Sequence, residues 1–178
     1  MNTKPTSIFI SYNPGNEFEQ TLAVRLHTIG AVHNFNMQMP DRFNNSKVIS
    51  TETIYRIKSS EYFILFSTSI LTPIVQQEVN IAFEHLQDKS KILIIYNKVK
   101  NLQHSASNCT EVYIDAGRES AQEILEKIIH EVKLNTAKGK NKKALAKEDN
   151  NEQNVLGGIL LVGLGLLALG TILNPQKK

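Results

Sequence analysis

The residue best placed for chemistry in this sequence is Glu78, an acid in a segment of helical spacing that begins at Pro73. That helix would follow a buried apolar run over residues 62–66, and Glu78 would lie in its second turn. Open α/β sheets bind ligands at the carboxyl ends of their strands, so the helix would hold the acid near such an edge. Ile74 lies one turn earlier beside the core-facing residues, which predicts a partly buried carboxylate. By position alone, however, most acids on amphipathic helices are solvated surface residues.

Other polar residues are expected at the same edge because they end strands or follow them. Ser11 and Tyr12 end the first apolar run, and Ser67 follows the third. Asp41 and Arg42 lie in a long polar loop, and long loops in compact α/β domains are often functional. A loop arginine can bind a pyrophosphate bidentately, and it can equally be a solvated charge. These five residues are therefore candidate substrate-binding residues.

The composition excludes several classes of site. One cysteine, Cys109, allows neither an internal disulfide nor a cysteine-rich zinc site, and the histidines show no metal-ligand spacing. The sequence holds no GxGxxG, Walker A or G-x-S-x-G motif. The net charge of +3 arises beyond residue 135, because acidic and basic side chains nearly balance before it. Neither a metal site nor a nucleic-acid-binding face is therefore expected.

Short apolar runs alternate with helical patterns along the first 135 residues, which is typical of βαβ units on a parallel sheet. The runs predict strands at residues 7–12, 62–66, 91–96 and 112–114, and a weaker, more polar second strand at residues 32–37. Helical spacing occupies residues 18–29, 48–57, 73–86 and 120–132, and residues 97–110 have room for a short helix. The sequence thus predicts an α/β domain over residues 1–135 with a flavodoxin-like, doubly wound sheet of five parallel strands.

Capping residues mark where these helices should begin and end. Asn16, Thr72 and Ser120 stand at expected starts, and Ser120 forms a capping-box pair with Glu123. Gly30 stands where the first helix should stop.

The C-terminal part has a different character. Residues 136–154 lose the apolar periodicity and are rich in Lys, Asn and Glu, which predicts a flexible linker. Residues 155–173 carry no charge, and a helix of that length would be about 28 Å long, close to the hydrocarbon thickness of a bilayer. The lysines before it indicate a single-pass membrane protein with its N-terminal domain in the cytoplasm and residues 174–178 as a short tail.

Glycines within the expected span are spaced so that pairs share one side of a helix. Gly158 and Gly165 are seven residues apart, as are Gly163 and Gly170. Small residues allow helices to approach closely in lipid, so self-association through this helix is one possibility and a plain anchor is the other.

The chain from residue 7 to about 130 resembles a TIR (Toll/interleukin-1 receptor) domain of the bacterial type. Residues 8–12 look like the family's FISY strand, and residues 54–67 resemble its next conserved segment. Residues 72–79 match the spacing of its S-x-W-C-x-x-E-L motif, with Ile and Val in place of Trp and Cys. The interval from the preceding serine to Glu78 is one residue shorter than usual.

The resemblance implies two classes of function. Some TIR domains are enzymes that cleave NAD at the nicotinamide–ribose bond, and the glutamate matching Glu78 is their catalytic residue. Others are scaffolds that signal by TIR–TIR assembly. The resemblance further implies NAD as a substrate with no cofactor, a homo-oligomer, and a role in bacterial antiphage defence or signalling.

The chemistry suits one carboxylate. Breaking an N-glycosidic bond passes through an oxocarbenium-like state, whose positive charge a fixed carboxylate stabilises. Nicotinamide leaves as a neutral molecule, so no second acid has to protonate it. The sequence therefore predicts a membrane-anchored NAD glycohydrolase or cyclase with Glu78 as the catalytic residue. It leaves open the product, ADP-ribose or a cyclic form.

The sequence is also compatible with two alternatives. In a non-enzymatic TIR scaffold, Glu78 would have only a structural role. In a nucleoside deoxyribosyltransferase, a similar sheet would present a carboxylate to a different sugar substrate.

Overall fold

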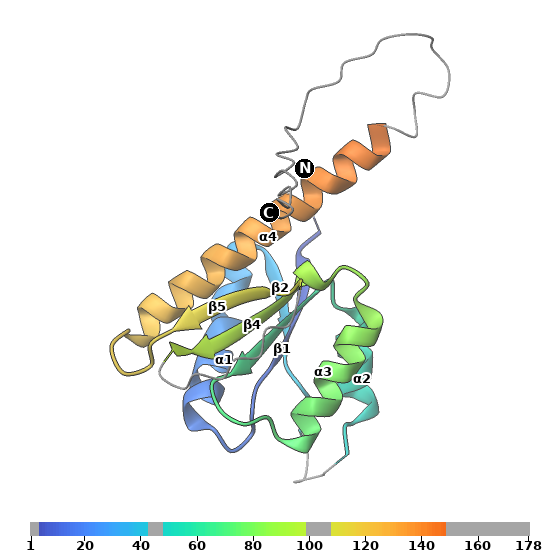
Figure 1. Ribbon diagram of the computed structural model, residues 1–178. Coiled ribbons are helices and arrows are strands. Elements are labelled where there is room, and N and C mark those ends of the chain that lie inside the picture. The colour runs from blue at the N-terminus through green and yellow to red at the C-terminus, as the bar shows by residue number, and fades with distance from the viewer. Residues whose placement is uncertain (1–3, 43–47, 99–107, 149–178) are drawn as a thin grey trace, which may run out of the picture. The chain divides into compact units, whose positions relative to one another are not determined.

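The computed structural model describes residues 4–42, 48–98 and 108–148, and its strands form one parallel sheet (Figure 1). The strands are β1 (Thr6–Ser11), β2 (Phe35–Gln38), β3 (Tyr62–Ser67), β4 (Ile92–Asn97) and β5 (Thr110–Ile114). The α-helices are α1 (Glu17–Gly30), α2 (Thr51–Ser59), α3 (Pro73–His85) and α4 (Ala121–Glu148), and the 3-10 helices are η1 (Ala31–His33) and η2 (Lys89–Lys91). The strand order β2-β1-β3-β4-β5 is that of a flavodoxin-like fold, which confirms the predicted sheet.

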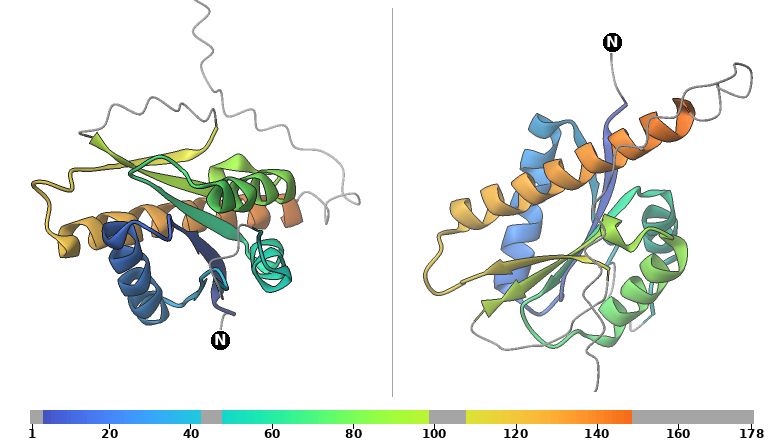
Figure 2. Two further views of the ribbon diagram at one scale, coloured as in Figure 1. Left: turned by 90° about the horizontal axis from the view of Figure 1, so that it is seen from below. Right: turned by 45° about the horizontal axis from the view of Figure 1, so that its top comes forward.

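The direction of the chain across the sheet explains which helices cover which face (Figure 2). From β1 the chain moves outward to β2, and it then returns past β1 to β3 and continues to β4. Because crossovers between parallel strands are right-handed, the reversal puts α1 on one face and α2 and α3 on the other. The reversal also leaves a switch point between β1 and β3, where the connections depart to opposite faces.

The hydrophobic core has two layers because strand side chains alternate between the faces. Ile8 and Ile10 of β1 pack with the apolar stripes of α1 and α4. Phe9, between them, packs with α2 and α3 and stacks on Phe63 at 5.7 Å between ring centroids. Both layers are buried, so the inner strands β1, β3 and β4 are buried along nearly their whole length, whereas the edge strands β2 and β5 include exposed residues.

Helix starts agree with the predicted caps. The Asn16 side chain accepts a hydrogen bond from the Glu19 N–H at 3.2 Å, and Ser120 and Glu123 form the expected capping box. Thr72 precedes α3 with Pro73 in the first turn, although the Thr72 side chain makes no capping hydrogen bond.

α1 ends at Gly30, where the sequence predicted that it would stop, but a left-handed glycine does not terminate it. Gly30 has ordinary helical dihedrals, and the left-handed residue is Asn34, after η1, with φ of 60°. Packing favours glycine here, because a Cβ at position 30 would lie 2.6 Å from Cγ of Met37 on β2 and the Met37 side chain would have to move.

The predicted linker is also partly wrong. α4 continues as a helix to Glu148, so residues 136–148 are helical where a flexible segment was expected. The Lys, Ala and Leu residues of this stretch have high helix propensity and extend a helix already nucleated and packed upstream. Contacts divide the chain into Met1–Lys142 and Lys143–Lys178, and the site described below belongs to the first unit.

The predicted membrane span lies outside the described residues. Within the part of the chain that the structure describes, no helix is both long and apolar enough to cross a bilayer. Residues 155–173, the tail 174–178 and the last part of the predicted linker are not among those residues.

Candidate functional site at the switch point

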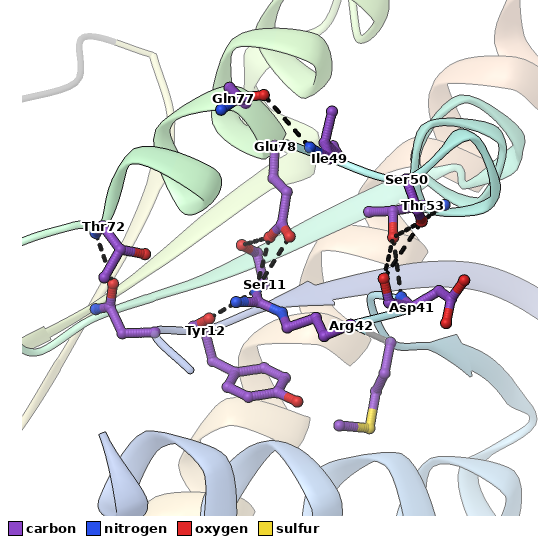
Figure 3. A network of polar contacts seen from close by, with 12 residues as sticks. Ser11, Tyr12, Asp41, Arg42, Ile49, Ser50, Thr53, Thr72, Gln77 and Glu78 are labelled. Atoms are coloured by element: carbon purple, nitrogen blue, oxygen red, sulfur yellow. Dashed lines mark hydrogen bonds and ion pairs between the residues drawn. The ribbon is translucent and has the colours of Figure 1, made fainter. Parts of the chain in front are cut away.

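Four of the predicted residues meet at the carboxyl ends of β1 and β3. Ser11 ends β1, Tyr12 follows it, Arg42 comes from the loop after β2, and Glu78 comes from α3 (Figure 3). This edge is the switch point of the sheet, where diverging connections leave space for ligands in doubly wound folds. The topology therefore brings together side chains that are as many as 67 residues apart.

Glu78 is a fully buried carboxylate. It shares the inward face of α3 with Val75 and Ala82, three residues before it and four after, so helical periodicity turns it toward the sheet. The Ser11 hydroxyl donates a hydrogen bond to Oε2, and Arg42 Nη2 donates to Oε1 at 3.0 Å and to Oε2 at 3.1 Å. Its 0% exposure exceeds the partial burial predicted from the sequence.

Arg42 connects the acid to the end of β1. Its Nη2 also donates to the backbone carbonyl of Tyr12 at 2.8 Å, and its guanidinium carbon lies 4.8 Å from the centre of the Tyr12 ring. The Nε and Nη1 atoms are buried and have no hydrogen-bond partner among the described residues. With 14% of its side chain exposed, Arg42 is not the solvated charge that the sequence left as an alternative.

Burial dominates the electrostatics of the site. It raises the pKa of Glu78 from 4.5 to about 7, although the Arg42 charge and the Ser11 hydrogen bond act in the opposite direction. Burial also raises the pKa of the Tyr12 phenol, which Arg42 lowers and Glu78 raises further. Near neutral pH the acid therefore exists in both protonation states, and pKa values perturbed in this way are enriched at functional sites.

Asp41 contributes its backbone rather than its carboxylate. Its N–H donates to Thr53 Oγ1 at 2.9 Å, and its carbonyl accepts from the hydroxyls of Ser50 and Thr53. These bonds tie the loop to the start of α2, and the Asp41 carboxylate points away from Glu78 (Figure 3). Asp41 thereby fixes the backbone from which Arg42 extends.

Ser67 is not joined to this group. It ends β3 with 4% exposure and pairs in register with Tyr96 of β4. The sequence correctly predicted that Ser67 lies at the carboxyl edge of the sheet. The hydrogen bonds that connect Ser11, Arg42 and Glu78, however, do not include it.

A second buried acid, Glu19, was missed by the sequence reasoning. Its carboxylate accepts from the Asn13 N–H at 2.8 Å, from the Thr68 N–H at 3.0 Å and from the Thr68 hydroxyl at 2.7 Å. The amide of Asn13 and the hydroxyl of Ser69 add further bonds. The available signal was the spacing of Asn16 and Glu19, which is that of a capping box.

The Glu19 cluster, defined as Glu19, Asn13, Thr68 and Ser69, holds together the loops that follow β1 and β3. Asn13 Oδ1 also accepts from the Thr72 N–H at 2.9 Å, at the start of α3. The cluster therefore links the strand end that carries Ser11 to the helix that carries Glu78. We assign it a structural role in positioning the site, since donors surround the carboxylate.

One groove in the described part of the chain lies away from Glu78. Its volume is about 480 Å³, and its lining includes Ile29, Val32 and His33 at the end of α1 and Ile129 and His130 of α4. It lies on the face covered by α1 and α4, whereas Glu78 belongs to α3 on the opposite face. The described ranges also contain no cluster of three potential metal ligands.

Comparisons with known proteins give only distant similarities. No family model matches the chain, and no curated protein matches it. A response regulator receiver protein from Sinorhizobium medicae WSM419 is 9% identical, with 74% of this chain and 98% of that chain covered and a TM-score of 0.45. The lysine decarboxylase LdcF from Francisella novicida is 14% identical over 75% of this chain but only 18% of its own, with a TM-score of 0.44. These similarities assign neither a family nor an activity to this chain.

Proposed function

We propose that this chain is an NAD glycohydrolase or cyclase of the TIR type, in which Glu78 stabilises the cation formed when the nicotinamide–ribose bond breaks. One observation carries the proposal: a fully buried carboxylate at the β1/β3 switch point, held between the Ser11 hydroxyl and the Arg42 guanidinium. Burying an acid is unfavourable unless it is well paired. A carboxylate buried at the edge where doubly wound sheets bind ligands therefore supports a role in catalysis.

The proposed reaction is a displacement at the anomeric carbon of the nicotinamide ribose. The bond from C1′ to the pyridinium nitrogen breaks, and its electron pair stays on nicotinamide, which leaves neutral. Water adds its oxygen to C1′ and releases one proton to the solvent, giving ADP-ribose. In the cyclase variant, a nucleophilic nitrogen of the adenine ring takes the place of water.

Glu78 would act through its charge. The carboxylate opposes the positive charge on C1′ and the ring oxygen, and this interaction is stronger in a dry site than in water. Ser11 would orient the carboxylate through its hydroxyl, and Tyr12 would contribute an aromatic wall beside it. Because only the ionised form stabilises a cation, a pKa of about 7 leaves a large fraction of the acid active at neutral pH.

The test is NAD turnover by the full chain reconstituted in liposomes, followed by chromatography of nicotinamide. Glu78→Gln keeps the size of the side chain and removes its charge, so we expect turnover to fall by about 100-fold or more. Glu84→Gln is the matched control, because Glu84 is an exposed acid on the same helix. Equal activity of wild type and Glu78→Gln would assign the chemistry to other residues.

A TIR scaffold without enzymatic activity is the second candidate, and the complete burial of Glu78 favours it. Both Glu78 oxygens accept hydrogen bonds and the side chain has no exposed surface, as in a structural ion pair. Wild-type protein that releases no nicotinamide at any density on liposomes, yet self-associates there, would support the scaffold.

We also propose that residues 155–173 anchor the protein in a membrane with the α/β domain on the cytoplasmic side, and that domains assemble there. Restriction to a surface raises the effective concentration of neighbouring domains. A rate of NAD cleavage that rises faster than protein density in vesicles supports assembly, and a strictly proportional rate opposes it.

A further inference from the structure

Arg42 has more hydrogen-bond donors than the protein uses. Nη2 serves the Tyr12 carbonyl and both oxygens of Glu78, whereas Nε and Nη1 are buried without a partner in the described chain. Buried donors of a charged group are rarely left unsatisfied, because each loses its hydrogen bonds to water. The guanidinium therefore presents N–H groups that suit an acceptor from outside the protein.

The same guanidinium blocks the acid that the proposed function requires. Arg42 neutralises Glu78 and donates to both of its oxygens (Figure 3). A positive charge at this distance weakens the ability of the carboxylate to stabilise a second cation. Catalysis by Glu78 thus requires that Arg42 leave it.

We propose that Arg42 selects phosphorylated substrates by exchanging partners: the pyrophosphate of a dinucleotide draws Arg42 away from Glu78, and the freed carboxylate takes the cationic nicotinamide riboside end. This inference rests on the proposed function and adds to it a substrate class and the residue that determines it. Arginine binds phosphate through paired N–H donors, and the unpartnered Nε and Nη1 groups supply them.

Charge balance explains why the phosphate is needed. In the structure, the Arg42 guanidinium is paired with the Glu78 carboxylate. A dinucleotide carries anionic phosphates and a cationic pyridinium, so both protein charges keep opposite partners after the exchange. Nicotinamide riboside has the same scissile bond and no phosphate. With that substrate the guanidinium would leave Glu78 without gaining an anion, which is unfavourable in a buried site.

The experiment compares NAD with nicotinamide riboside, using the full chain in liposomes. We expect wild-type kcat/KM to be about 100-fold or more higher for NAD. Arg42→Gln should lose most of that preference, because NAD loses its phosphate partner and the riboside no longer has to displace a guanidinium from Glu78. Arg42→Lys keeps the charge without the planar fork and should recover part of the preference. Arg118→Gln is the control, since the Arg118 side chain is 89% exposed on another loop. Equal wild-type rates for the two substrates, or a preference unchanged in Arg42→Gln, would overturn the inference and leave the proposed function standing.

Binding of ADP-ribose separates the inference from the activity, because this molecule holds the pyrophosphate and lacks the scissile bond. We expect calorimetry to show binding by wild type and by Arg118→Gln, and at least tenfold weaker binding by Arg42→Gln. If no protein cleaves NAD but ADP-ribose binding still depends on Arg42, the proposed function fails and phosphate recognition by Arg42 stands. If wild type does not bind ADP-ribose, or if Arg42→Gln binds it as tightly as wild type, phosphate recognition by Arg42 is refuted.

Discussion

Arg42 Nη2 lies 3.0 Å from Glu78 Oε1, although 36 residues separate the two in the chain. The ion pair joins the loop after β2 to helix α3, and it does so beside the carbonyl that follows β1. The protonation state of Glu78 and the position of Arg42 are therefore linked. The same pairing is the basis of the first two predictions below.

The pH dependence of NAD cleavage should report the ionisation of Glu78. Only the carboxylate stabilises a cation, so we expect kcat/KM to rise with pH and to level off above a midpoint near 7. The measurement is the initial rate of nicotinamide release by the full chain at subsaturating NAD. A midpoint near the ordinary glutamate value of 4.5 would show that burial does not govern the acid during turnover.

Protein stability should change with pH in the opposite direction. Glu78 titrates near 4.5 in the unfolded chain and near 7 in the folded one, so between these values the folded protein binds more protons. The free energy of unfolding therefore falls as pH rises through this window, by about 3 kcal/mol from this group. Glu78→Gln cannot titrate and should lack this contribution.

Urea unfolding of wild type and Glu78→Gln in the same detergent, across that pH window, isolates the Glu78 contribution as a difference. The unfolding free energy of wild type minus that of Glu78→Gln should decrease steadily as the pH rises. A difference that does not vary with pH would mean that the carboxylate is already ionised without penalty in the fold.

Substitution of Glu19 should loosen the loops that position the site. Glu19→Gln replaces one acceptor oxygen by an NH₂ group, which would face the Asn13 N–H if it takes the place of Oε2 or the Thr68 N–H if it takes the place of Oε1. We expect a loss of about 3 kcal/mol in unfolding free energy, since charge-assisted bonds are lost and buried donors are left unpaired. Glu17→Gln, an exposed acid of the same helical turn, is the control and should change stability little.

Hydrogen exchange gives a local readout of the same variant. The Thr72 N–H donates to Asn13, so its exchange should accelerate in Glu19→Gln by more than the loss of global stability explains. Uniform acceleration at all core amides would instead indicate general destabilisation without a specific link to α3.

Replacing Gly30 should destabilise the protein in spite of helix propensity. Alanine normally favours a helix by up to about 1 kcal/mol over glycine. Here the new Cβ would lie 2.6 Å from Cγ of Met37, so we expect a net loss of about 1 to 3 kcal/mol. Gly15→Ala, where a Cβ has no atom within 4 Å, is the control. The loss should shrink in the background of Met37→Ala, and equal losses in both backgrounds would argue against the steric cause.

Deletion of residues 155–178 should release the protein from membranes. The described core makes its contacts upstream of this segment, so the shortened chain should remain folded. In cell fractionation the full chain and a chain lacking only residues 174–178 should pellet with membranes after carbonate extraction, while the longer deletion stays in the supernatant. A full chain that remains in the supernatant would refute the anchor.

The sequence by itself determined β1, β3, β4 and β5, most helix starts and the class of fold. It placed the start of the second strand at residue 32, whereas η1 occupies Ala31–His33 and β2 begins at Phe35. Apolar runs such as that of β3 predict buried strands because a strand covered on both faces is apolar throughout. The capping pair of Ser120 and Glu123 predicts the start of α4 because it satisfies free backbone N–H groups locally. These features depend on neighbours a few residues apart, which a sequence displays directly.

Only the tertiary structure decided which hydrogen bonds and ion pairs connect the residues of the site. The sequence placed Ser11, Arg42 and Glu78 at one edge of the sheet, but it could not show that the arginine and the serine donate to the acid. It also missed Glu19, because an acid in the first turn of a helix ordinarily serves the helix terminus. Burial and pairing of a charge depend on chain segments distant in sequence, and these come together only when the sheet is assembled.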